Sequence, residues 1–123
     1  MRYLTARKRA EGKGAAGTGA EHHWHMIISS VGLALIVPAF LYLFGGMLGQ
    51  GHEAVIARLS HPGIAILFAL VLFVGMLHFR SGATVMIEDY ARGVTRKVLL
   101  IALACLTYGT IATGLFALGK IAF

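Results

Sequence analysis

The segment HFRSGATVMIEDY, residues 78–90, places an imidazole, a carboxylate and a phenol in or beside one strongly apolar run. His78 lies inside the run that starts at Gly63, and Asp89 and Tyr90 close it. An ionisable residue within a membrane span is costly and therefore indicates a functional site. Neutral imidazole is a common axial ligand of haem iron. A carboxylate beside a phenol suits proton-coupled chemistry on a quinone, because the phenol can donate a hydrogen bond to a quinone carbonyl.

The spacing of these residues places them along one face of a helix. Gly75 lies three residues before His78 and Gly82 lies four residues after it, so both share its face. A flat macrocycle could lie against the backbone there, where side chains are absent. Asp89 follows His78 by eleven residues, almost three turns, and returns to the same face roughly 16 Å further along. Arg80 points about 200° away, where it could snorkel to the membrane interface or neutralise a haem propionate.

Less specific interpretations fit the same residues. A lone histidine in a membrane helix can simply hydrogen-bond to a neighbouring helix. Glu88, Asp89 and Tyr90 can form an ordinary polar helix end, although the helix dipole disfavours an acid at that end. The HHWH segment at residues 22–25 is better explained as a polar interfacial cap than as a metal site, because no cysteine or acid cluster completes a ligand set.

The composition indicates a membrane protein. Of 123 residues, 58% are hydrophobic and 13% are charged, about half the usual charged share. Spanning the hydrocarbon core takes roughly 20 apolar residues in a helix, and lipid offers no partner for the open backbone groups of other structures. A soluble bundle of core helices is the poorer alternative, because almost no polar face remains for water. We predict an all-α membrane protein with three transmembrane helices, about 24–48, 62–90 and 96–120.

These helices form one membrane domain, residues 22–123, behind a cytoplasmic tail, residues 1–21. The net charge of +6 is placed as membrane topology requires, so no nucleic acid partner is expected. Basic residues concentrate in the tail and near residues 88–97, whereas the opposite side carries only Arg58 and Lys120. The excess of Lys and Arg in cytoplasmic segments predicts a cytoplasmic N-terminus and a periplasmic C-terminus. Three helices offer little interior for a polar group, which favours a second membrane protein as a partner.

The pattern H-x3-G-x6-D-Y, from His78 to Tyr90 in the second helix, resembles the small hydrophobic membrane anchor of succinate dehydrogenase, respiratory complex II. The opening MRYLTARKRA, the HHWH entry to the first helix and the segment VMIEDYARG resemble the alphaproteobacterial form. The resemblance implies a chain that is inactive alone and belongs to an oxidoreductase complex in the bacterial inner membrane. It implies three protein partners besides lipids, namely a flavoprotein, an iron–sulfur protein and a second membrane anchor, cytochrome b556.

The resemblance also assigns roles to residues. His78 would be one axial ligand of a haem b shared with the cytochrome b556 anchor, inside a larger haem-containing bundle of both anchors. Gly75 and Gly82 would pack against that haem. Tyr90 would hydrogen-bond the carbonyl of ubiquinone, the substrate, and Asp89 would support its protonation.

One segment departs from this pattern. Many relatives carry an arginine early in the first helix, near the haem propionates and the quinone, whereas this chain reads MIISSVG there. Ser29, Ser30, His25 or the cytochrome b556 anchor would have to take its place. Two other functions stay open: a haem b anchor of another respiratory enzyme, of the fumarate reductase or hydrogenase type, and a structural or transport membrane protein without haem. A haem spectrum and the associated proteins would separate them.

Overall fold

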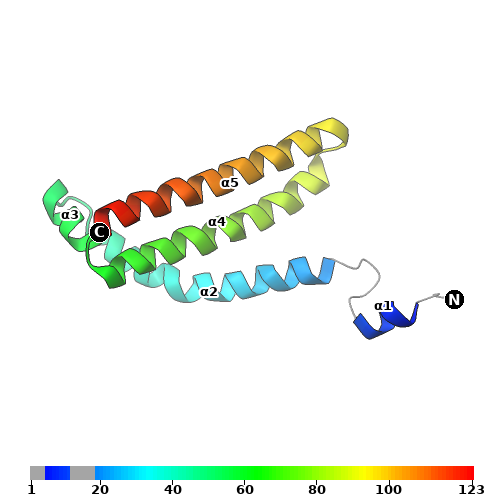
Figure 1. Ribbon diagram of the computed structural model, residues 1–123, viewed down its shortest axis with the longest axis horizontal. Helices are drawn as coiled ribbons and strands as arrows, with labels where there is room; N and C mark the ends of the chain where they lie inside the picture. Colours follow the sequence, from blue (N-terminus) through cyan, green and yellow to red (C-terminus); the bar gives the residue numbers. More distant parts are fainter. Residues whose placement is uncertain (1–4, 12–18) are drawn as a thin grey trace.

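A computed structural model describes residues 5–11 and 19–123 of the chain. The helices are, in order, α1 (Ala6–Glu11), α2 (Gly19–Gly45), α3 (His52–Leu59), α4 (Pro62–Tyr90) and α5 (Gly93–Ala122) (Figure 1). No strand occurs in the described ranges. Residues Glu21–Gly45 of α2, together with α4 and α5, are long and apolar enough to cross a membrane. The predicted all-α architecture with three membrane-spanning helices is confirmed, whereas much of the predicted tail lies outside the described residues.

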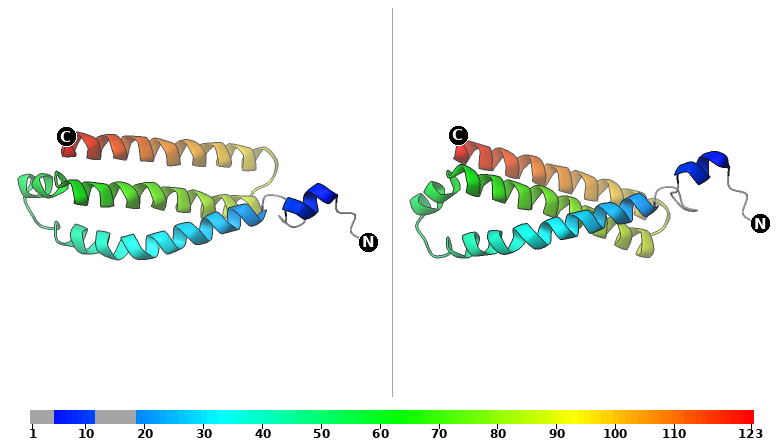
Figure 2. Two further views of the ribbon diagram at one scale, coloured as in Figure 1. Left: turned by 60° about the horizontal axis from the view of Figure 1, so that its bottom comes forward. Right: turned by 90° about the horizontal axis from the view of Figure 1, so that it is seen from below.

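The three long helices form an open row with α4 in the middle (Figure 2). Helix α4 runs antiparallel to both of its neighbours and contacts each of them. In the described part of the chain, α2 and α5 make no direct contact with each other. The row is therefore not a closed bundle, and α4 is flanked on two sides without being enclosed.

Very few side chains are buried within this row. Among the described residues, the buried hydrophobic side chains are Met47, Ala65, Leu103 and Ile111. Large apolar side chains point outward from every long helix, as Leu35 does with 74% of its surface exposed and Phe116 with 73%. Exposed apolar surface on this scale belongs against lipid or a partner protein, which agrees with the membrane assignment.

The two junctions of the row are held by close packing rather than by a deep core. Between α4 and α5, Gly114 leaves the space that the Leu72 side chain fills, because a Cβ there would overlap Leu72 Cδ2. Between α2 and α4, the rings of Phe40 and Phe68 meet edge to face with centroids 4.8 Å apart. Small residues permit such approaches in lipid, where van der Waals packing drives helix association.

The first residues of α2 and the α4–α5 turn lie at one end of the row, and α3 and the C-terminus lie at the other (Figure 1). Residues 49–61 lie between the first two predicted membrane helices, where a loop is expected, but His52–Leu59 folds into helix α3. Glu53 in its first turn and Arg58 in its last turn complement the helix dipole. The hydroxyl of Ser60, just after α3, lies 2.9 Å from the carbonyl of Ile56 and 3.0 Å from the carbonyl of Ile121, and the second contact brings this segment against the end of α5.

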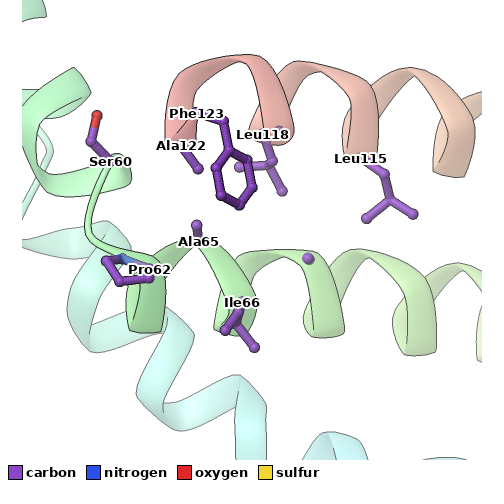
Figure 3. Close-up of a pocket in the computed structure, with 10 residues that line it drawn as sticks. Ser60, Pro62, Ala65, Ile66, Leu115, Leu118, Ala122 and Phe123 are labelled. Atoms are coloured by element: carbon purple, nitrogen blue, oxygen red, sulfur yellow. The ribbon is translucent and has the colours of Figure 1, made fainter.

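An apolar crevice of about 380 Å³ opens at this end between the start of α4 and the end of α5. Figure 3 shows Phe123 and Leu118 on one side, and Ala65 and Ile66 on the other. Its lining carries no charged side chain. The polar chemistry of the chain lies toward the other end of the row.

Candidate functional site

His78 is half-buried and faces helix α2. Its Nδ1 lies 2.8 Å from the Oγ of Ser29. The same Ser29 hydroxyl donates to the carbonyl of Met26, one turn earlier in α2, at 3.0 Å. Ser29 therefore engages Nδ1, and Nε2 is the ring nitrogen left for a ligand.

The two glycines that share the His78 face have different surroundings. A Cβ at Gly75 would lie 3.9 Å from Leu33 Cδ2, an ordinary contact, so Gly75 lies at the junction with α2. A Cβ at Gly82 would meet nothing within 4 Å. Open space next to the helix backbone therefore lies beside Gly82, on the α4–α5 turn side of His78.

A polar cavity of about 340 Å³ lies at the same level of the row, lined by His22, Leu77, Arg80, Ser81 and Thr84. The Nε2 of His22 is buried there and has no hydrogen-bond partner among the described residues. A buried polar atom left unsatisfied costs about 1–3 kcal/mol. The cavity thus has an imidazole nitrogen, a guanidinium and two hydroxyl groups around one space, which is a suitable set for binding an anionic or carbonyl-bearing group.

The position of Arg80 is set by helix α5. Its Nη1 donates to the hydroxyl of Tyr108 at 2.6 Å, and its guanidinium carbon lies 5.0 Å from the centroid of the Tyr108 ring. A guanidinium has five N–H donors, so this contact leaves donors for the cavity. Arg80 is expected from the sequence to contact the interface or a propionate, but its neighbours Tyr108 and His22 are not evident there.

In residues 5–11 and 19–123, no three side chains of His, Cys, Asp or Glu gather to hold a metal ion. A single imidazole can nevertheless bind iron when a porphyrin supplies the equatorial ligands. His78 is therefore suited to haem iron rather than to a free metal ion.

The last three residues of α4 differ in their contacts. Glu88 pairs with Arg96 at the start of α5, with Oε1 and Nη2 2.6 Å apart. Asp89 is exposed and has no hydrogen-bond or ion-pair partner among the described residues. Tyr90 is 88% exposed. The acid and the phenol thus project freely, whereas the neighbouring glutamate fixes the α4–α5 turn.

An open groove of about 740 Å³ adjoins Tyr90. It is bounded by the end of α4, the turn and the start of α5, with Met86, Ile87, Tyr90, Ala91, Arg92, Thr95 and Leu99 as its lining. The groove combines apolar side chains with one phenol and one guanidinium. A ring with polar carbonyl groups and an apolar tail matches that combination.

Comparison with known proteins decides the family. The family described as succinate dehydrogenase/fumarate reductase transmembrane subunit matches residues 1–117. The chain belongs to this family. A succinate dehydrogenase hydrophobic membrane anchor subunit from Paracoccus denitrificans is 39% identical over 120 residues, which cover 98% of this chain and 93% of that protein. No solved structure matches the chain.

The resemblance found in the sequence is thereby confirmed for a succinate dehydrogenase/fumarate reductase transmembrane subunit. The matched region, residues 1–117, contains all of α2 and α4. His78, Asp89 and Tyr90 therefore lie within the part of the chain that carries the family relationship. With three apolar spanning helices, this family member is a multi-pass membrane protein.

Proposed function

We propose that this chain is a membrane anchor of a succinate:ubiquinone oxidoreductase. Its family and its 39% identity to a hydrophobic membrane anchor support this function. The observation that carries the proposal is the contact between His78 Nδ1 and Ser29 at 2.8 Å, because it leaves an imidazole nitrogen for haem iron within an apolar helix row. The chain contributes no flavin or iron–sulfur chemistry of its own and works only within the complex.

His78 would hold one axial position of a haem b, and the second membrane anchor, cytochrome b556, would hold the other. Three features fit such a group: a ring nitrogen left for iron, open space beside Gly82, and a cavity with the unpartnered Nε2 of His22. His22 and Arg80 would receive a propionate there, because both can donate hydrogen bonds to a carboxylate. Haem b, when bound, would supply a one-electron redox group in the membrane, on the side of the quinone away from the docked iron–sulfur protein.

Tyr90 and Asp89 would serve the quinone at the other end of the site. The Tyr90 hydroxyl donates a hydrogen bond to a ubiquinone carbonyl, and the exposed carboxylate of Asp89 passes protons from water. Glu88 does not take part, because Arg96 already neutralises it. Helix α4 continues unbroken from His78 to Tyr90, so one rigid element sets the distance between the two groups.

The open row leaves room for the partners of this chain. The cytochrome b556 anchor would cover α4 where α2 and α5 leave it open, and lipid would cover the outer faces. The basic residues at the α4–α5 turn, including Arg92 and Lys97, support a cytoplasmic position for that end in a bacterial inner membrane. The iron–sulfur protein and the flavoprotein would dock there, beside Tyr90.

A second function shares the same site. The family description names fumarate reductase as well as succinate dehydrogenase, so the anchor could serve a complex that works in the opposite direction with a reduced quinone. The two functions differ in the quinone and in the direction of electron flow, not in the roles of His78 and Tyr90.

The deciding experiment is a reduced-minus-oxidised visible spectrum of the complex purified through a tag on this chain in mild detergent. We expect a low-spin b-type spectrum, with the flavoprotein and the iron–sulfur protein in the same fraction. Haem without those two proteins would favour another haem b enzyme. Intact material with neither haem nor partners would overturn the proposal in favour of a structural or transport protein.

A further inference from the structure

The structure assigns a positioning role to Ser29: its hydroxyl accepts the Nδ1 proton of His78, fixes the imidazole in the Nδ1–H tautomer and so presents the Nε2 lone pair to haem iron. This inference rests on the proposed haem ligation by His78 and goes beyond it, because it names the group in helix α2 that sets the ligand's protonation and orientation. Ser29 itself does not touch the iron.

The tautomer follows from counting protons. A serine hydroxyl has one proton to donate and lone pairs to accept with. Ser29 directs its proton to the carbonyl of Met26 at 3.0 Å, a common back-bond of serine within a helix. With its proton so directed, its oxygen, 2.8 Å from the ring, is free to accept a proton from Nδ1. Neutral imidazole carries one N–H, so Nε2 is left as the acceptor.

A second requirement leads to the same tautomer. Iron binds a nitrogen lone pair, and a metal-bound histidine almost always donates its other ring N–H to an oxygen, which orients the ring and raises its basicity. Ser29 provides such an oxygen. It does so from α2, so the His78 ring is fixed across a helix junction within this one chain and before any partner protein is added.

Ser30 offers a matched comparison on the same helix. Its hydroxyl also donates to the carbonyl of Met26, at 2.5 Å, as serine commonly does within a helix. Ser30 is exposed, and its side-chain hydrogen bond within the described residues goes to Met26. A change at Ser30 thus removes the hydroxyl bond to the Met26 carbonyl without altering the His78 contact.

The test uses the purified complex and four variants of this chain: Ser29→Ala, Ser29→Cys, Ser29→Thr and Ser30→Ala. The midpoint potential of the haem and the haem-to-flavin ratio after prolonged detergent washing are measured for each. Loss of the Nδ1–H acceptor makes the imidazole a weaker electron donor to the iron. The reduced iron is then stabilised relative to the oxidised iron. We expect Ser29→Ala to shift that equilibrium about tenfold, or about 59 mV upward for a one-electron couple, and to weaken haem retention roughly 10–100-fold.

The other variants separate a positioning role from a structural one. Ser29→Thr keeps a hydroxyl and should match the unmodified complex, and so should Ser30→Ala. Ser29→Cys has a weak acceptor and should lie between the two, which keeps the inference testable should Ser29→Ala fail to assemble. An unchanged potential in both Ser29→Ala and Ser29→Cys, or an equal shift in Ser30→Ala, would overturn the inference.

Failure of the underlying function gives a different result. If His78→Ala retains the low-spin haem spectrum, haem ligation by His78 is wrong whatever the Ser29 variants do. If His78→Ala loses that spectrum while the Ser29 variants remain unchanged, only the role of Ser29 is wrong.

Discussion

Helix α4 carries candidate groups in two contrasting surroundings. Near its middle, His78 is half-buried and held by Ser29 from a neighbouring helix of the same chain. At its end, Tyr90 is 88% exposed and Asp89 has no partner among the described residues. The same rigid helix thus presents one group that the chain has already oriented and two that it has left free.

The difference indicates what each group requires from the rest of a complex. If His78 binds haem as proposed, its ring needs only the haem and a second ligand from the partner anchor, because Ser29 already contacts the ring within this chain. Tyr90 and Asp89 need a partner to exclude water, since a phenol in open water gains little from one more hydrogen bond. The orientation of the His78 ring should therefore depend mainly on residues within the row, whereas quinone chemistry should depend on assembly.

The largest expected effect is at the oriented end. His78→Ala removes the only side chain of the row proposed to bind iron, so the low-spin b-type spectrum of the purified complex should be lost. His52→Ala is the matched control, because His52 is exposed at the first turn of α3 near the opposite end of the row. A normal low-spin spectrum in the His78 variant would show that His78 does not bind the haem. Haem binding and quinone chemistry would then not be separated along α4.

At the free end, Tyr90→Phe removes one hydroxyl and leaves the ring. We expect quinone reduction to fall on the order of 10²-fold, as is usual when a positioned proton donor is lost. Succinate oxidation measured with an artificial acceptor should stay within about twofold, because that reaction bypasses the quinone. An equal fall in both activities would show that the change disturbs assembly rather than the quinone.

The two neighbouring acids at the end of α4 sharpen the contrast further. Asp89→Asn removes the proton-relaying carboxylate, and quinone reduction should fall roughly 10-fold, a smaller loss than at Tyr90 because water can replace a relay. Glu88→Gln should leave the rate nearly unchanged, because it loses only an exposed ion pair to Arg96, worth about 0–1 kcal/mol. Steady-state rates with a short-chain quinone compare the two, and a larger loss at Glu88 would reverse their assigned roles.

The smallest effect concerns the packing that holds α5 to α4. In Gly114→Ala the new methyl group would overlap Leu72, so the leucine must leave its preferred rotamer, at a cost of about 1 kcal/mol. Gly109→Ala should be neutral or slightly stabilising, because a Cβ there meets nothing within 4 Å and alanine favours helix. Thermal denaturation of the purified complex should give a lower midpoint for Gly114→Ala than for Gly109→Ala. Equal midpoints would show that Leu72 can move aside without loss of stability.

The membrane helices could be predicted because hydropathy along the chain is set by residue type alone. The long uncharged stretches left no other structure possible in lipid, and His61–Pro62 marked the first turn of α4. Helix α3 was missed because its eight residues (His52–Leu59) are too few to give a strong periodic signal. Its amphipathic pattern and its end charges were the signals that could have revealed it.

The neighbours of the site residues could not be predicted for a different reason. Periodicity places His78, Gly75 and Gly82 on one face, but it does not say which helix that face meets. Ser29 against His78 and Tyr108 against Arg80 depend on how each helix is rotated about its axis. All-round apolar helices carry little information about that rotation, because no polar face distinguishes the inside from the outside.

The central place of α4 in the open row also has a consequence for biogenesis. Helix α2 is made first, yet its sole membrane-spanning neighbour within the described chain is α4, whose last residue is Tyr90. At ordinary rates of synthesis, α2 must wait in lipid as a lone helix for a time on the order of seconds. Lipid can solvate the apolar surface of α2 during that time. The Ser29–His78 contact can form only after α4 has inserted. The proposed haem-ligand site is therefore completed only after the second long helix has entered the bilayer.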